Sequence, residues 1–589
     1  MKRRIPLTEL GFERGIEMEG LSGFRELFFP VPRADSVQGL RLILPYRSDA
    51  AFESRRSIQV EVDGSPVLTT ALPNSTHAGT IDIPIDASSI REDYLRIGLR
   101  YSGAITEDRC VDERVSGAYL SFEPEGALVA SIERDSLDSV GDVAAIMPKT
   151  MDIVLPENIS EAHAAAALTL AAGYDLARIT AGQPEAYEDE WTRSRMLIAG
   201  TDASALAVDK ESEQPEIRIG GDDPAAAARL LRSQWNLLAS KGTVRSAKAE
   251  KSRRERLTFA DLGGDTSVQR ISNRGSWTVP LPLTALEPGE TPSGLAVDVA
   301  VADDGSVTSP VVSVLMNGVL LGSAKAVRGE RTRVSVDLPE GLIAASNSIE
   351  VAVTRQVRAG DCAYAPQAYE AQLLPSSHVK LGAAGRPVDF SDLAPAFADG
   401  VTVVMPGPDA LGGVRRLVST LVDGQTPIRV SYGDIPEDGP YVLVSDSPPP
   451  GTDPSVRIEG ETVPFIGIDG RNLIDSEAMS IFTIAQLVSD GGRTALWIRP
   501  GVDFASGVSA GKPVSLGRGD VAFIDGNGIE LAFSTERDRL VDISYPDETS
   551  FLELLKRYWL WLVVIGWLLA SAGFVYLLRS VYKSRKPGG

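Results

Sequence analysis

The chain has 589 residues, which is too long for one hydrophobic core and predicts several domains. Lysine and arginine number 58 and aspartate and glutamate 80, and the resulting charge of −22 disfavours a nucleic-acid partner, whose phosphates would be repelled. Abundant glycine and proline and many short alternating apolar runs favour a β-rich globular protein over a helical or disordered one.

The chain is duplicated with a period near 250 residues, and both copies contain the same motifs in the same order. The paired segments are 7–11 with 257–263, 29–32 with 279–282, 40–44 with 295–299, 60–64 with 314–318, and Cys110 with Cys362. Several of them alternate as half-buried strands do. Asp63-Gly64 and Asn317-Gly318 favour the positive φ angles of type I′ hairpins. The first half of each copy is therefore predicted to be a β-sandwich.

The second half of each copy alternates strand-like runs with capped helices, as βαβ units require. In the first copy, helices are predicted over 158–173 and 223–240, each starting at a polar cap. In the second copy, they are predicted over 409–424 and 475–489. Each copy is thus a sandwich followed by an α/β domain.

These patterns divide the chain into five parts. They are a first sandwich (1–130), a first α/β domain (131–256), a second sandwich (257–382), a second α/β domain (383–546) and a C-terminal membrane segment (547–589). The basic stretch 241–256 joins the two copies and is expected to be a solvated linker or helix end.

The C-terminus predicts a membrane anchor. Residues 558–578 carry no charge and, at about 1.5 Å per residue, are long enough to cross a hydrocarbon core as a helix. Basic residues are denser after this span than before it, so the short tail is expected in the cytoplasm and the bulk of the chain outside it. Ser550 and Glu553 have capping-box spacing, which predicts either an interfacial stretch that docks on a membrane partner or the first turns of the same helix. No apolar signal-peptide stretch follows Met1, so an export signal is expected to have been removed or replaced.

The sequence predicts no catalytic residue, cofactor or metal site. It contains no nucleophile elbow, P-loop, zinc-protease motif or dinucleotide fingerprint, and its three histidines lack ligand spacing. Paired carboxylates of a glycosidase remain an alternative, because two carboxyls suffice for that chemistry. Cys110 and Cys362 suit one disulfide bridge in an oxidising compartment, and two separate buried thiols are the alternative.

Four aromatic residues near predicted strand ends are candidates for stacking on sugar faces. They are Tyr46, Phe52, Tyr101 and Tyr364. Ordinary core or edge packing is the alternative for each ring.

In order, duplication and final helix, these motifs resemble the B subunit of bacterial cellulose synthase over essentially the whole chain. The resemblance implies two carbohydrate-binding-like jelly-roll domains alternating with two flavodoxin-like α/β domains that hold no flavin, on the periplasmic side of the inner membrane. It also implies a membrane-embedded glycosyltransferase that the C-terminal segment contacts and activates. The residues implied in this contact are Phe551, Leu552, Leu555, Tyr558, Trp559 and Trp561. The chain departs from the family in its compact length and in lacking a tryptophan platform on the sandwich loops.

We therefore expect a non-catalytic, membrane-anchored periplasmic subunit of a cellulose or β-glucan synthase, which activates the glycosyltransferase and guides the emerging polysaccharide. The lipid bilayer and the nascent polysaccharide are expected partners, and free strand edges allow a lateral homo-oligomer. A stand-alone membrane-tethered glycan-binding protein and a membrane-tethered hydrolase are the alternatives.

Overall fold

The computed structural model describes residues 1–543 apart from internal segments. The longer of these segments are 105–117, 183–189, 200–204, 234–240, 245–255, 356–368, 458–463, 467–471, 476–480 and 505–512, and shorter gaps cover one to four residues each. Among the residues that the structure describes, no helix is both long enough and apolar enough to cross a membrane. The predicted transmembrane helix 558–578 lies outside the described part.

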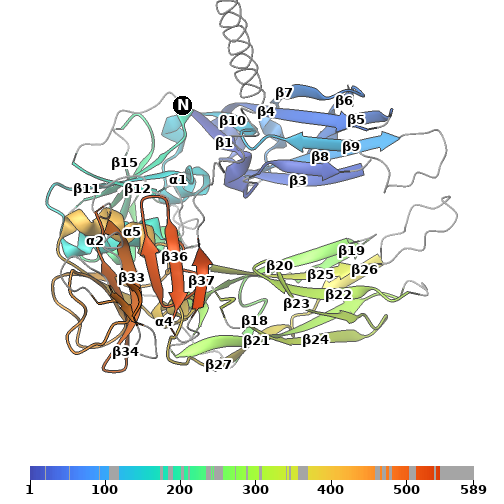
Figure 1. Ribbon diagram of the computed structural model, residues 1–589. Coiled ribbons are helices and arrows are strands. Elements are labelled where there is room, and N and C mark those ends of the chain that lie inside the picture. Colours follow the sequence, from blue (N-terminus) through green and yellow to red (C-terminus); the bar gives the residue numbers. More distant parts are fainter. Residues whose placement is uncertain are drawn as a thin grey trace, which may run out of the picture.

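Strands dominate the fold, and helices are few (Figure 1). In the view of Figure 1, the two β-sandwiches lie one above the other on the right, and the two α/β units lie beside them on the left. The first sandwich is above the second, and a space separates their ribbons.

The first sandwich consists of two sheets whose apolar sides face each other. One sheet has the strand order β13-β1-β10-β4-β9-β2, with β7 paired to β4, and the other has the order β3-β8-β5-β6. Alternate residues point inward, and Leu95, Ile97 and Leu99 of β8 are fully buried in the core. The strands are β1 (Lys2–Pro6), β2 (Ile16–Glu19), β3 (Ser22–Pro30), β4 (Val37–Ala50), β5 (Arg55–Val62), β6 (Ser65–Leu72), β7 (His77–Ile85), β8 (Tyr94–Ala104), β9 (Ala118–Phe122), β10 (Ala127–Ile132) and β13 (Glu190–Trp191).

The second sandwich repeats this arrangement. Its sheets have the orders β18-β27-β21-β26-β19, with β24 paired to β21, and β20-β25-β22-β23. Strand by strand, these are the orders of the first sandwich without β13, which confirms the duplication predicted from the sequence. The strands are β18 (Leu257–Thr258), β19 (Val268–Ile271), β20 (Arg274–Pro282), β21 (Glu290–Val301), β22 (Val311–Met316), β23 (Val319–Lys325), β24 (Arg331–Asp337), β25 (Ser346–Thr354), β26 (Tyr369–Leu373) and β27 (His378–Ala383).

Equivalent two-residue turns close one hairpin in each sandwich. Asp63 and Gly64 join β5 to β6 with φ angles of 49° and 77°, and Asn317 and Gly318 join β22 to β23 with 51° and 78°. Positive φ at both positions is what a type I′ turn requires. The structure confirms both predicted hairpins.

The two α/β units also share one strand order. Numbered in chain order within the main sheet of each unit, the first five strands lie as 2-1-3-5-4, and the first, second, third and fifth are parallel. The second unit also contains a separate hairpin of β31 (Pro464–Ile466) and β32 (Asn472–Asp475). A flavodoxin-like sheet has the order 2-1-3-4-5, so the likeness holds for three strands and then ends. The strands are β11 (Met151–Leu155), β12 (Ala177–Ala181), β14 (Ser194–Ile198), β15 (Leu206–Asp209), β16 (Glu216–Ile219) and β17 (Thr243–Val244) in the first unit, and β28 (Val401–Met405), β29 (Ile428–Tyr432), β30 (Tyr441–Val444), β33 (Thr483–Asp490), β34 (Arg493–Arg499), β35 (Val521–Ile524), β36 (Ile529–Ser534) and β37 (Arg539–Ile543) in the second.

A tight turn accounts for this departure in the second unit. Only Gly491 and Gly492 separate β33 from β34, and their φ angles are 57° and 92°. A two-residue connection joins antiparallel strands, because a parallel pair needs a longer crossover. β33 is therefore antiparallel to β34 and lies on the side of β34 away from β30.

The helices are shorter than the sequence pattern predicts. α2 (Glu161–Ala171) begins after the cap Ser160, α3 (Pro224–Arg232) begins after Asp223, and α5 is Leu411–Val418. The predicted helix 475–489 is wrong, because its second half is the strand β33. β33 lies between β34 and β35 and is largely buried. Its apolar residues, Ile484, Ala485, Leu487 and Val488, do not alternate with polar ones, and their spacing fits a helical period as well as a buried strand.

The two α/β units pack directly against each other. α2 of the first unit lies against β29 and α5 of the second, and buried residues of both units belong to one continuous core. The Tyr432 backbone N–H donates to Glu161 Oε1 at 2.7 Å, and its hydroxyl donates to the Ile159 carbonyl at 3.1 Å. Arg415 on α5 donates to the Ala177 carbonyl at 2.7 Å, and its side chain is fully buried.

Each sandwich is attached to its own α/β unit in a different way. β13, which follows the first α/β strands in sequence, pairs in parallel with β1, and the buried Arg3 donates to the Ile146 carbonyl at 2.8 Å. In the second copy, Ala394 of the helix α4 (Leu393–Phe397) packs into the core of the sandwich, whereas Leu393 and Phe397 of the same helix belong to the core of the α/β units. The second sandwich has a core cluster of its own.

Arg415→Ala tests the interface between the α/β units. We expect a loss of about 2 to 3 kcal/mol in unfolding free energy, because the buried Ala177 carbonyl loses its donor and a cavity replaces the side chain. Urea titration followed by tryptophan fluorescence measures this loss of unfolding free energy. Arg429→Ala, at an exposed position on β29, is the matched control and should change stability by less than about 0.5 kcal/mol. Equal effects of the two substitutions would contradict this account.

The second sandwich contains a buried carboxylate, Asp298, on β21. Arg333 binds both of its oxygens, at 2.7 and 2.6 Å, and Ser376 Oγ donates to Oδ2 at 2.6 Å. Hydrogen bonds from Arg333 outweigh the effect of burial and lower the pKa of Asp298 to about 2. A lowered pKa in the folded state means that the ionised form stabilises the fold.

Asp298→Asn should therefore destabilise the protein in a pH-dependent way. The stabilisation from the ionised carboxylate is complete above the unfolded pKa of about 3.9, where it amounts to at most about 2 kcal/mol, because Arg333 is half exposed. It is lost as the pH falls towards about 2. The stability difference between parent and variant, measured by urea titration at pH 7 and pH 3, should shrink at the lower pH. A difference that stays constant or grows would refute the assignment.

Candidate functional site

The outer side of the sheet β3-β8-β5-β6 carries exposed aromatic rings. The side chains of Phe24, Phe28 and Tyr94 are 41%, 51% and 38% exposed. Phe28 and Tyr94 meet edge to face, with ring centroids 5.7 Å apart. Large rings are usually mostly buried, so three exposed rings on one sheet mark a candidate binding surface. We use the name β3–β8 face for the outward residues Phe24, Glu26, Phe28, Tyr94, Arg96 and Arg100.

The rings of the β3–β8 face are interleaved with paired charges. Arg96 Nε donates to Glu26 Oε1 at 2.8 Å, and this hydrogen bond raises the pKa of Arg96. Arg100 Nε donates to Glu61 Oε1 on β5 at 2.9 Å. The Arg100 guanidinium also lies 4.5 Å from the centroid of the Phe24 ring, which is a cation–π distance. The charged groups are therefore already paired around the rings.

The second sandwich provides an internal comparison for this face. Its sheet β20-β25-β22-β23 has the same strand order, and the pairing of Phe29 with Leu95 corresponds to that of Val279 with Ile349. At the positions of Phe24, Glu26, Phe28, Tyr94, Arg96 and Arg100 it has Arg274, Ser276, Thr278, Ser348, Glu350 and Thr354. The fold thus forms without the rings, so folding does not explain their presence in the first copy.

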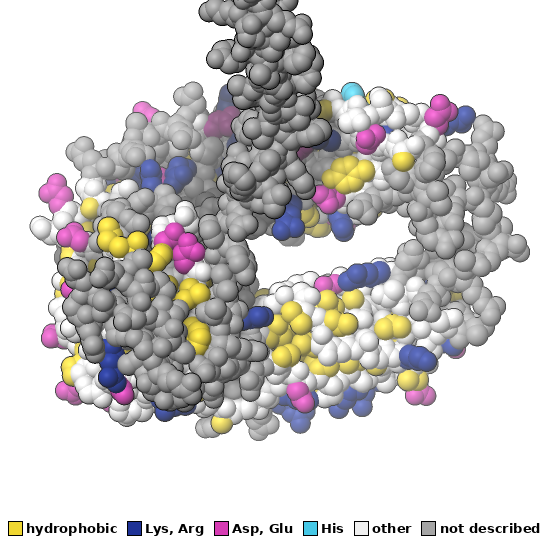
Figure 2. Space-filling view, viewed as in Figure 1, with side chains coloured by type: hydrophobic (Ala, Val, Ile, Leu, Met, Phe, Trp, Pro, Cys, Tyr) yellow, Lys and Arg dark blue, Asp and Glu magenta, His cyan; other side chains and the backbone are white. Residues whose placement is uncertain are grey.

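The strand β3, at the edge of the sheet that carries the β3–β8 face, borders the space between the two sandwiches. In Figure 1, β3 is the lowest strand of the upper sandwich, and β20 and β25 are at the top of the lower one. Figure 2 shows an open space between the two sandwiches, with hydrophobic and basic side chains along its upper border. A ligand can enter this space from solvent.

The aromatic residues chosen from the sequence are not part of this face. Tyr46 and Tyr101 are buried in the core, with 7% and 1% of their surfaces exposed, so neither ring can stack on a sugar. This corrects the prediction for both residues. Tyr101 has the same orientation as the inward residues of β8, and Tyr46 packs its ring near Phe122 in the core. Phe52 and Tyr364 lie outside the described residues.

A signal for the exposed rings was present in the sequence. Phe28 and Phe29 are adjacent in a strand, so one of them must point outward. Leu95, Ile97, Leu99 and Tyr101 share one parity and predict a buried Tyr101. The prediction relied on strand ends instead of this alternation.

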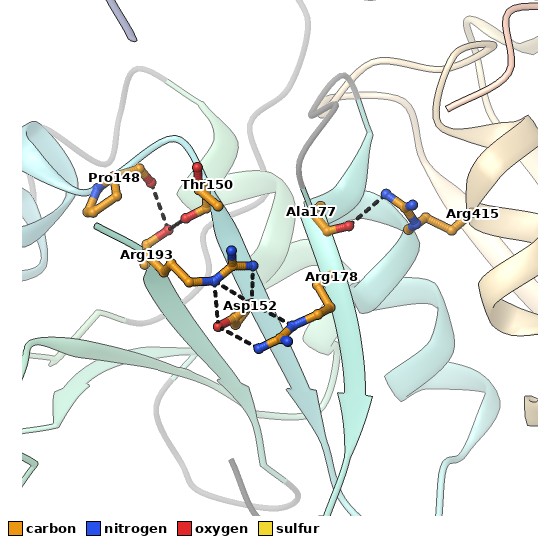
Figure 3. A network of polar contacts seen from close by, with 8 residues as sticks. Pro148, Thr150, Asp152, Ala177, Arg178, Arg193 and Arg415 are labelled. Atoms are coloured by element: carbon orange, nitrogen blue, oxygen red, sulfur yellow. Dashed lines mark hydrogen bonds and ion pairs between the residues drawn. The ribbon is translucent and has the colours of Figure 1, made fainter. Parts of the chain in front are cut away.

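A second polar cluster lies at the amino-terminal edge of the first parallel sheet (Figure 3). Asp152 on β11 accepts from Arg178 Nε on β12 at 3.1 Å and from Arg193 Nη2 at 2.6 Å. Burial alone would raise the pKa of Asp152, but the hydrogen bonds from both arginines have a larger combined effect, so its pKa lies below the usual value. The corresponding pair of the second unit is Thr402 and Arg429. We assign the cluster a structural role, because it ties neighbouring strands of one sheet together.

The remaining predicted site residues lie outside the described part. They are Cys110, Cys362, Phe551, Leu552, Leu555, Tyr558, Trp559 and Trp561. Within the described ranges, no group of three or more His, Cys, Asp or Glu side chains is arranged to hold a metal ion.

Comparison with known proteins identifies the domain that carries the β3–β8 face. Residues 1–131 match the family model described as "Cellulose synthase BcsB, first CBM domain", a carbohydrate-binding module. For this part of the chain, the match confirms the resemblance to the B subunit of cellulose synthase.

Other relatives are more distant. The uncharacterized protein YdaN of Bacillus subtilis (strain 168) is 24% identical over 245 residues, which cover 40% of this chain and 34% of that protein. The chain therefore matches about a third of this relative's length. Among solved structures, the M60 catalytic domain with two CBM51 domains from Clostridium perfringens ZmpB is 11% identical, covering 62% of this chain and 34% of that one, with a TM-score of 0.15. The sugar-binding C-terminal domain of EclA is 10% identical, covering 20% and 77%, also with a TM-score of 0.15. TM-scores this low do not indicate a shared overall fold.

Neighbouring substitutions on β3 test whether the exposed rings serve the fold. Phe28→Thr, which introduces the residue of the second sandwich, should cost about 1 kcal/mol or less, because the ring is half exposed. Leu27→Ala, on the opposite side of the same strand, should cost about 2 to 5 kcal/mol, because it opens a cavity in the core. Urea titration gives both values. A Phe28→Thr cost as large as that of Leu27→Ala would assign the ring to the fold.

Proposed function

We propose that the chain is a non-catalytic subunit of a bacterial polysaccharide synthase of the cellulose-synthase type, and that it binds the emerging polysaccharide on the β3–β8 face. The observation that carries this proposal is the match of residues 1–131 to the first carbohydrate-binding module of cellulose synthase BcsB. The exposed rings lie within that same stretch.

The chemistry of the face suits a sugar polymer. The apolar faces of pyranose rings pack on aromatic side chains, and their hydroxyl groups can both donate and accept hydrogen bonds. Arg96 and Glu26 offer a donor and an acceptor next to each other, and so do Arg100 and Glu61. Binding of this kind orients the polymer and needs no reactive group.

The rest of the proposal concerns the membrane. Residues 558–578 would anchor the chain in the inner membrane, with the two jelly-roll sandwiches and the two α/β units, variants of the flavodoxin-like sheet, in the periplasm. The segment 547–557 and this helix would contact a membrane-embedded glycosyltransferase. Such contact activates the enzyme only if it is more favourable in the enzyme's active conformation. A bridge between Cys110 and Cys362 and a lateral homo-oligomer remain predictions.

A stand-alone, membrane-tethered glycan-binding protein is the second candidate. The β3–β8 face favours it, because all of its residues belong to one sandwich of this chain and need no partner to form the surface. The two functions differ in whether polymer synthesis depends on this chain.

Deletion of the chain from Asp547 onward tests the synthase function. Membranes that contain the full chain and its copurifying glycosyltransferase should incorporate labelled sugar into polymer, and the deletion should reduce incorporation at least about tenfold, because the contact that favours the active state is lost. The control is Thr278→Ala in the full chain, which changes an exposed residue of the second sandwich, keeps the C-terminal segment and should retain incorporation. Unchanged synthesis after the deletion would favour the stand-alone function.

A further inference from the structure

We propose that the β3–β8 face holds a single extended, uncharged polysaccharide chain along β3, gripped at two separate ring stations. This inference rests on the proposed function and adds to it the footprint of the ligand and its charge. One station is Phe24 with Arg100, and the other is Phe28 with Tyr94.

The spacing of the stations sets the length of the ligand. Phe24 and Phe28 are four residues apart on one strand, so their backbones are separated by about 13 Å at the usual rise of a β-strand. One sugar ring can therefore contact one station only, whereas an extended oligosaccharide can reach both. Phe24 pairs in register with Arg100, and Phe28 with Arg96, so both stations follow the direction of β3.

The middle of the face is suited to hydroxyl groups. Glu26 lies between the two phenylalanines on the outward side of β3 and binds Arg96. Gly98 lies on β8 opposite Glu26, and a Cβ added there would come within 3.2 Å of both Phe24 and Glu61. A glycine at this position lets the Phe24 ring and the Glu61 side chain lie close against the sheet.

The charges of the face argue for an uncharged ligand. Its two arginines are each bound to a carboxylate, Arg96 to Glu26 and Arg100 to Glu61. An anionic polymer would have to displace a glutamate, and a cationic polymer would have to displace an arginine. The net charge of −22 further disfavours a polyanion. Hydroxyl groups can bind to both members of each pair without separating them.

Titration of the full, detergent-solubilised chain with unbranched β-glucan oligosaccharides, from the disaccharide to the hexasaccharide, tests the two stations. Isothermal calorimetry should show a rise in affinity of about tenfold once the ligand is long enough to reach both rings, because a second aromatic contact is added. Phe24→Ser should remove this rise and leave disaccharide binding to the Phe28 and Tyr94 station. Thr278→Ala, on the equivalent face of the second sandwich, is the control and should retain the rise.

Four other results would overturn the inference in distinguishable ways. Binding that is independent of oligosaccharide length, or a rise that survives Phe24→Ser, rejects the two stations and leaves the proposed function standing. Binding of an oligogalacturonate as tight as that of the neutral oligosaccharide rejects the uncharged ligand. Absence of binding to any glucan, with parent and variants sharing one thermal unfolding midpoint, rejects glycan binding itself.

Discussion

The contact between the two α/β units determines where both sandwiches lie. α2 of the first unit packs against β29 and α5 of the second, and the buried guanidinium of Arg415 donates to the Ala177 carbonyl across the interface. Such a group is costly to bury unless its hydrogen bonds are made, so this geometry tolerates little displacement. Each sandwich is then held by its own α/β unit, the first through β13 and the second through Ala394 of α4, which packs into the sandwich core. The space between β3 and the second sandwich is a consequence of these attachments.

Duplication explains how such a face can arise without cost to the fold. Both sandwiches bury the same alternating positions, because the inward side of each strand must fill one core. The outward positions are free of that requirement. In the first copy they include aromatic rings, and in the second they are polar or charged, as Phe28 and Thr278 illustrate. The difference between the copies is therefore more informative than either copy alone.

The features that the sequence predicts correctly are those decided by local chemistry. Asp63-Gly64 and Asn317-Gly318 have few alternatives to a type I′ turn, and the order of motifs gives the duplication directly. The strand β33 was mistaken for a helix because burial on both sides removes the period of two. Partners distant in sequence, such as Arg415 and Ala177, leave no local pattern at all.

The same reasoning explains why the sequence predicts only part of the candidate site. Which side of β3 is outward follows from Phe28 and Phe29 being adjacent, but that Phe24 and Arg100 meet depends on the register of β3 with β8. A shift of one residue would point Phe24 and Phe28 into the core. That register is enforced by the inward partners Phe29 and Leu95, which are fully buried. The core therefore positions a surface that it does not itself need, and this allows exposed rings to be held in a fixed arrangement for a ligand.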